Sequence, residues 1–195
     1  MIPFLVGFVL AVLIAAAAYR RGSLSASGAL GAVLVGTITF ALGGWAGGAL
    51  LVLFFVSSSG LSHYREGFKE QLGDKFSKGH RRDIWQTLAN GGVGAACLLG
   101  NALAPSPLWW AGFVGAIATV NADTWATELG VLARNRPILL TTGRAVEPGT
   151  SGAITATGTL AALPGSALIA LVGGIATWQS GLAAALAIGL GGALS

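Results

Sequence analysis

The segment LWWAGFVGAIATVNADTWATELGVL, residues 108–132, is apolar except for a central group of polar side chains. It is long enough to cross a bilayer as a helix, which takes about 20 residues at 1.5 Å each. It also contains Asp123 and Glu128, the only two of the seven carboxylates that cannot be assigned to a loop. An ionisable group at bilayer depth costs about 2.5 to 3.5 kcal/mol. The two acids therefore indicate a reaction or a transport path.

The composition of the whole chain agrees with a membrane location. Hydrophobic residues make up 54% of it and charged residues 9%, which leaves too few polar side chains to solvate a compact soluble surface. We predict an all-α, polytopic transmembrane helical bundle that forms a single domain over residues 1–195. Seven apolar segments are candidate spans, the last of them short, so we expect six to seven spans: residues 2–19, 26–42, 45–61, 84–104, 108–132, 152–177 and 181 onward.

The distribution of basic residues predicts the orientation. All eleven Lys and Arg fall in three clusters, at Arg20 and Arg21, at residues 65–82 and at residues 134–144. Alternating spans bring these clusters to one side, which the positive-inside rule assigns to the cytoplasm, so the N-terminus is expected outside. The main cytoplasmic loops are then about residues 62–83 and 134–150. We expect the plasma (inner) membrane of a prokaryote and no binding to nucleic acid, since the net charge of +4 reflects topology.

The polar residues of the fifth span divide into two stripes. At 100° per residue, Asp123 and Thr127 lie on one stripe, and Asn121, Thr124 and Glu128 lie on another, well over 100° away. The helix should therefore be central in the bundle, or bent so that both acids reach one cavity that opens to the cytoplasm. An interhelical hydrogen-bond network without chemistry is the alternative explanation.

Two further regions are candidates for phosphate binding. Arg82, Gln86 and Asn90 recur every four residues and should share one helix face that descends from the cytoplasmic side. Residues 64–76 fit either a helix on the inner leaflet or a solvated loop. Thr150 and Ser151 should cap the sixth span, whose free N–H groups favour an anion; capping alone would also explain these two residues.

These motifs resemble one family. They are Lys75-Phe-Ser-Lys78-Gly-His-Arg81-Arg82-Asp-Ile-Trp-Gln86-Thr-Leu-Ala-Asn90-Gly-Gly, Asn121-Ala-Asp-Thr-Trp-Ala-Thr-Glu128-Leu-Gly and Pro148-Gly-Thr-Ser-Gly152. They are similar to the signatures of the integral membrane family catalogued as domain of unknown function 92, which includes chloroplast phytyl-phosphate kinases. The resemblance implies transfer of a phosphoryl group from a nucleotide, with CTP expected rather than ATP, to a prenyl monophosphate. Family members continue past Ser195 with a further acidic membrane segment, so we expect a truncated chain.

Such a transfer would be a magnesium-dependent kinase reaction, and the residues of this chain supply each part that it needs. Phosphoryl transfer needs a divalent metal, cations that hold the phosphates and in-line positioning. Asp123 and Glu128 would hold Mg²⁺, and Asn121 and Asn90 would complete its shell or orient a phosphate. The expected binding residues for the nucleotide and acceptor phosphates are Lys75, Lys78, Arg81, Arg82, Gln86, Thr124, Thr127, Arg144, Thr150 and Ser151. The prenyl chain would lie in the lipid between glycine-rich helices.

Two other classes remain open on the sequence alone. A cation-coupled secondary transporter would also place Asp123 and Glu128 in the membrane, although no inverted repeat is evident and the basic clusters are less expected. A cytidylyl- or alcohol-phosphotransferase would use the same metal and nucleotide, with more aspartates than this chain has. The prenyl chain, the choice between CTP and ATP, and the number of subunits stay open, homo-oligomers included.

Overall fold

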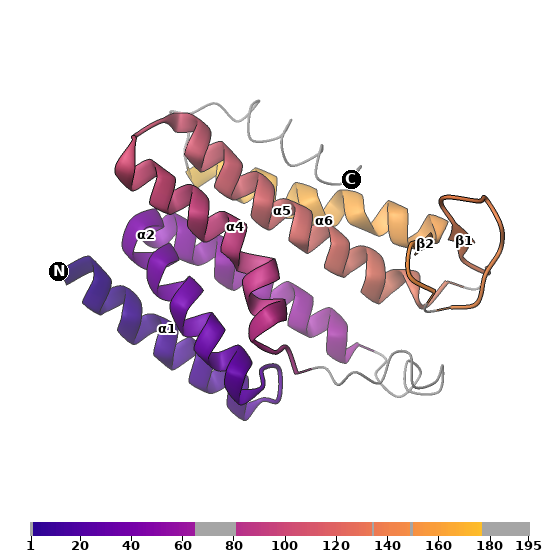
Figure 1. Ribbon diagram of the computed structural model, residues 1–195, viewed down its shortest axis with the longest axis horizontal. Helices are drawn as coiled ribbons and strands as arrows, with labels where there is room; N and C mark the ends of the chain where they lie inside the picture. Colours follow the sequence, from indigo (N-terminus) through magenta and orange to yellow (C-terminus); the bar gives the residue numbers. More distant parts are fainter. Residues whose placement is uncertain (1, 65–80, 134, 149, 177–195) are drawn as a thin grey trace.

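The computed structural model describes residues 2–64, 81–133, 135–148 and 150–176, and these form a bundle of helices (Figure 1). The predicted helical architecture is confirmed for this part of the chain, to which the structure adds two short strands. Its elements are α1 (Ile2–Arg20), α2 (Ala26–His63), α4 (Ile84–Leu103), α5 (Pro107–Gly130) and α6 (Ala156–Ala176), with a small antiparallel pair of strands, β1 (Ile138–Leu139) and β2 (Ala153–Ile154). The predicted seventh span, from residue 181, lies outside the described residues.

Helix α2 contains the two segments predicted as the second and third spans. They are two helical arms, residues 26–43 and 45–63, separated by Gly44, whose φ of 58° and ψ of −156° are not helical. The chain turns back at this glycine and brings the two arms close together beside the bend. A methyl group at Gly48, on the second arm, would lie 2.0 Å from the ring of Phe40 on the first arm. Figure 1 shows the two arms diverging from this bend. Glycine is required at Gly44 because this backbone conformation is essentially closed to other residues.

Helix α5 is central in the bundle, as predicted. It packs against α2, α4 and α6, and its inner face carries Phe113, Val114 and Ile117, all with an exposed fraction of 0%. These side chains form one core with Leu50 of α2 and Ile169 of α6. The helix is continuous from Pro107 to Gly130, without a non-helical residue between the two acids.

The connections divide between the two ends of the bundle. In Figure 1 the end of α1, the end of α2 and the start of α4 lie along the bottom and the β1–β2 segment lies at the right, whereas the bend of α2 and the α4–α5 turn lie at the upper left. The basic residues that the structure describes therefore gather at one end, as the positive-inside argument requires. Among the described helices, α1, α2 and α6 are long and apolar enough to span a membrane by length and composition. The full span count and an outside N-terminus stay predictions.

The start of α6 corrects the prediction for the last loop. The sixth span was expected from residue 152 with Thr150 and Ser151 as caps, but α6 begins at Ala156 and the cap is Thr155, whose Oγ1 accepts a hydrogen bond from Gly158 N at 3.0 Å. Thr150 Oγ1 instead donates to Glu147 O at 2.7 Å within a turn. The strand β2 occupies the residues in between, and strands of two residues leave no periodicity for sequence analysis to detect.

Candidate functional site

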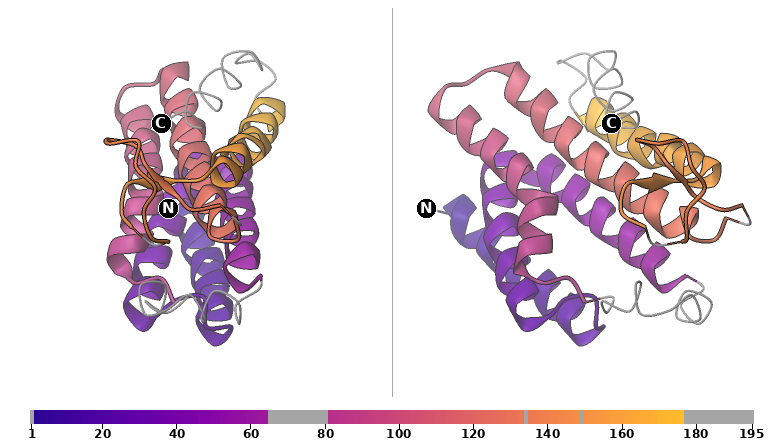
Figure 2. Two further views of the ribbon diagram at one scale, coloured as in Figure 1. Left: turned by 90° about the vertical axis from the view of Figure 1, so that its right-hand side faces the viewer. Right: turned by 45° about the vertical axis from the view of Figure 1, so that its right-hand side comes forward.

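The polar residues at the basic end of the bundle come from three elements. The second arm of α2 supplies a run of serines that sequence analysis missed because the surrounding segment is apolar. The run Ser57-Ser-Ser-Gly-Leu-Ser62 in a membrane helix is a signal that could have revealed them, since such side chains often bond to a neighbouring helix. Figure 2 shows the end of this arm, the end of α5 and the start of α4 gathered toward the basic end of the bundle.

Asn121 ties three helices together. Its side chain is fully buried, Oδ1 accepts a hydrogen bond from Ser57 Oγ of α2 at 3.0 Å, and Nδ2 donates to Gly165 O of α6 at 2.7 Å. Both ends of the amide are thus used within the protein. This geometry supports a positioning role for Asn121, and it matches the interhelical network that the sequence left open.

Glu128 lies seven residues further along α5 and therefore on almost the same side of the helix. Its half-buried carboxylate accepts a hydrogen bond from Ser62 Oγ of α2 through Oε1 at 2.7 Å. Ser62 itself lies one turn beyond Ser58, to whose carbonyl its hydroxyl also bonds at 3.0 Å. The second arm of α2 therefore holds α5 at two levels, through Ser57 and through Ser62.

Arg82 is the cation of this region. Its Nη1 donates to Ser59 Oγ at 3.1 Å, and the guanidinium carbon lies 5.9 Å and 5.7 Å from the ring centroids of Phe54 and Phe55. Burial lowers the pKa of Arg82, and the negative charge of Glu128 partly offsets this effect. Arginine nevertheless stays protonated in proteins. The structure therefore keeps a permanent, partly desolvated positive charge within the electrostatic influence of a carboxylate.

We call Ser59, Ser62, Arg82 and Glu128 the polar cluster. Ser59 and Ser62 belong to α2. Arg82 lies two residues before α4, and Glu128 lies in the last turn of α5. A carboxylate acceptor, a guanidinium donor and two hydroxyls can bind an anion or a divalent cation with its phosphate ligands. No group of three His, Cys, Asp or Glu side chains placed to hold a metal occurs among the residues that the structure describes.

Asp123 lies away from the polar cluster. It is five residues from Glu128 on a continuous helix, which places it about 140° around the axis, and its side chain is exposed, as is that of Thr127. Thr124 Oγ1 bonds to its own helix, at Val120 O. The structure thus brings Asn121 and Glu128 to the α2 side of α5 and places Asp123 on the outer side.

The remaining predicted site residues have different surroundings. Gln86 belongs to a capping box at the start of α4, in which its Oε1 accepts from Asp83 N at 3.0 Å, so it does not continue the face of Arg82. Helical periodicity fails for Arg82 because that residue precedes the helix. Asn90 is half-buried beside an apolar cavity, and Arg81 and Arg144 are exposed. Lys75 and Lys78, together with the predicted amphipathic helix, lie outside the described residues.

An apolar helical bundle with buried polar contacts and one basic end defines a polytopic membrane protein. The chain belongs to the family described as integral membrane protein DUF92, whose model matches residues 9–195. The resemblance seen in the sequence motifs is thereby confirmed.

Relatives of the chain include proteins of a plant, an archaeon and a cyanobacterium. It is 34% identical to Protein PGR of Arabidopsis thaliana over 84% of this chain and 61% of the relative, and 36% identical to an uncharacterized membrane protein of Methanocaldococcus jannaschii over 75% and 60%. It is 34% identical to the chloroplastic Protein VTE6 of Arabidopsis thaliana over 77% and 46%. The chain thus spans about half to three fifths of the length of these relatives. No solved structure matches it.

Proposed function

We propose that this protein is a membrane prenyl-phosphate kinase, which transfers the γ-phosphoryl group of CTP to a prenyl monophosphate. The observation that carries the proposal is the polar cluster at the basic end of a bundle of this family, in which the second arm of α2 bonds to Arg82 through Ser59 and to Glu128 through Ser62. A prenyl monophosphate would lie in the membrane with its phosphate at that end, within reach of a soluble nucleotide.

The reaction needs positioning and charge more than covalent chemistry. An oxygen of the prenyl monophosphate attacks the γ-phosphorus of CTP, the bond from this phosphorus to the β–γ bridging oxygen breaks, and CDP leaves. The attacking oxygen is already ionised, so no general base is required. Arg82 would hold the acceptor phosphate, because its planar guanidinium suits two-point contact with phosphate oxygens. The exposed Arg81 and Arg144 would bind the nucleotide.

The residues fit a magnesium ion shared with phosphates. Mg²⁺ is usually bound by one or two carboxylates, by substrate phosphates and by waters. Glu128 meets this need inside the polar cluster, where Ser62 orients its carboxylate. Asp123 would serve as the second carboxylate only for phosphates on the outer side of α5. The ion would neutralise phosphate oxygens during transfer.

Purified protein incubated with Mg²⁺, radiolabelled CTP or ATP and a panel of prenyl monophosphates tests the proposal. We expect a labelled prenyl diphosphate, and no product from the free prenyl alcohol. Glu128→Gln keeps the size of the side chain and an acceptor for Ser62 but loses the charge, so it should lower turnover about 100-fold or more. Asp123→Asn should do the same if the outer acid also binds the metal. Glu147→Gln, an exposed acid in the loop, is the matched control.

Full activity of both Glu128→Gln and Asp123→Asn would contradict the proposed mechanism, in which a carboxylate of α5 holds the metal. Sodium- or proton-driven uptake of a solute by proteoliposomes, with no phosphoryl transfer, would favour the transporter class instead. Both measurements use the same purified chain, so a negative kinase result can be interpreted.

A further inference from the structure

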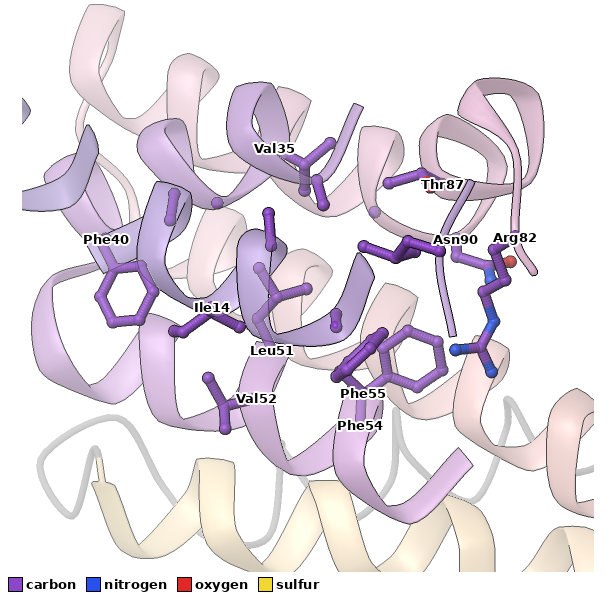
Figure 3. A pocket seen from close by; sticks show the side chains of 17 residues that line it. Ile14, Val35, Phe40, Leu51, Val52, Phe54, Phe55, Arg82, Thr87 and Asn90 are labelled. Atoms are coloured by element: carbon purple, nitrogen blue, oxygen red, sulfur yellow. The ribbon is translucent and has the colours of Figure 1, made fainter. Parts of the chain in front are cut away.

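A cavity lies between α1, the two arms of α2 and the start of α4. It has a volume of about 70 Å³, and the empty space within its lining, including the part open to the surroundings, is about 640 Å³. Figure 3 shows apolar side chains along it, among them Ile14, Val35 and Leu51, with Phe40 at one end. The wall from α1 is formed by Ile14 and by alanines, including Ala11, Ala15 and Ala18, which leave a narrow apolar space.

The opposite end of the cavity is polar. Arg82, Thr87 and Asn90 line it, as Figure 3 shows. Among the described residues, the guanidinium of Arg82 donates one hydrogen bond, to Ser59, although it has five N–H groups. The half-buried amide of Asn90 makes no hydrogen bond within the same part of the chain. Glu128 offsets only part of the cost of burying this cation, so an anion at the cavity end would stabilise the guanidinium donors that the described residues leave unused.

We propose that this cavity binds the hydrocarbon chain of a single-chain lipid phosphate, whose phosphate group contacts Arg82 and Asn90. The inference rests on the proposed function and assigns the acceptor to a site inside the protein rather than to the lipid between helices. The apolar wall suits the part of the chain nearest the phosphate, because the first arm of α2 lines the cavity from Ala32 to Phe40, about 12 Å of helix. The cation at one end alone selects an anionic head.

A membrane phospholipid shares the phosphate but has two chains, and the space between α1 and α2 is narrow. Close helix approach causes this narrowness, since a methyl group at Gly36 would lie 2.9 Å from Ala11 Cβ. The expected ligand is therefore a prenyl monophosphate, and an ordinary phospholipid is the competing source that the experiment separates.

The first experiment is photolabelling of the purified protein with a prenyl monophosphate that carries a diazirine in the part of its chain nearest the phosphate. We expect labelled peptides from α1 and from both arms of α2, and competition by unlabelled phytyl phosphate but not by phytol or by phosphatidylglycerol. Labelling confined to α5 and α6, or equal competition by phosphatidylglycerol, would overturn the proposal. The readout needs no turnover, so it stays valid if kinase activity is absent.

The second experiment fills the cavity. Ile14→Trp places a large side chain in it, and Leu13→Trp, on the exposed side of the same helix, is the matched control. We expect Ile14→Trp to abolish the photolabelling and to raise KM for a twenty-carbon acceptor about tenfold or more, while a five-carbon prenyl monophosphate is used as before. Leu13→Trp should behave like the unchanged protein.

Val52→Phe, with the exposed Val56→Phe as its control, repeats the test from α2 if Ile14→Trp does not fold. An active kinase whose long-chain KM is the same in filled and control variants would overturn the inference and leave the proposed function intact. Labelling in the cavity without any phosphoryl transfer would support the inference and reject the kinase.

Discussion

The main chain of Arg82 pairs with the loop between α1 and α2, from Arg82 N to Ser23 O and from Ser25 N to Arg82 O, both at 3.0 Å. Gly28 allows this contact, because a methyl group there would lie 1.9 Å from the Arg82 carbonyl oxygen. The backbone bonds thus fix the position of the Arg82 Cα, and Ser59 and two phenylalanine rings contact the guanidinium at the other end of the side chain. A side chain held at both ends loses little entropy when it binds a phosphate.

Arg82→Lys tests this arrangement. Lysine keeps the charge but loses the planar fork and the stacking on Phe54 and Phe55, so we expect turnover with a prenyl monophosphate to fall about 10- to 100-fold. The exposed Arg21→Lys, at the same end of the bundle, should retain full turnover. The measurement is the initial rate of both variants at saturating CTP, with unfolding temperature in detergent as a check on folding. Equal rates would mean that Arg82 does not hold the acceptor.

Sequence analysis identified Arg82, Glu128 and Asn121 as site residues but not their partners. Charges and amides in apolar segments are detectable because they are costly there. Ser59 and Ser62 are small and nearly neutral in cost, so only the packing of α2 against α5 reveals them. The separation of Asp123 from Glu128 follows from helix geometry, since α5 has no non-helical residue between the two acids.

At the scale of elements, the bend between the two arms of α2 depends on one glycine, Gly44. Residues 26–42 and 45–61 were predicted as separate spans from their apolar lengths, and the bend at Gly44 confirms two arms without a loop between them. The sequence could not reveal this continuity, because Gly43 and Gly44 are compatible with either a turn or a kinked helix. The last loop was less predictable, since its two short strands depend on pairing across more than ten residues.

Gly44→Ala should therefore destabilise the protein. A residue with a Cβ in this backbone region costs about 1 to 3 kcal/mol, and no neighbouring atom lies within 4 Å to offer compensation. Gly60→Ala on the second arm also has nothing within 4 Å of its added methyl group, but its backbone is helical, so it should be neutral or stabilising. Thermal unfolding of both variants in the same detergent measures the difference. A Gly44→Ala variant as stable as Gly60→Ala would show that the bend tolerates a side chain.

At the scale of the whole molecule, the proposed kinase function requires that the polar cluster and the nucleotide share one compartment. The ends of α1, α2 and α5 and the start of α4 lie at the same end of the bundle (Figure 1), and the described basic residues are found there. A soluble nucleotide is then available only if this end faces the cytoplasm. The orientation of the bundle is therefore part of the mechanism.

Cysteine labelling in intact cells tests the orientation. In a Cys97→Ala background, a cysteine at the exposed Pro105, in the α4–α5 turn, should react with a membrane-impermeant maleimide from outside. A cysteine at the exposed Thr142, in the loop before α6, should react only after permeabilisation, because the positive-inside rule places that loop in the cytoplasm. If Thr142→Cys reacted in intact cells and Pro105→Cys did not, the orientation of the bundle would be the reverse of the predicted one. The reversed orientation would place Arg82 and Glu128 on the side without CTP, and a kinase that draws on the cytoplasmic nucleotide pool would then be excluded.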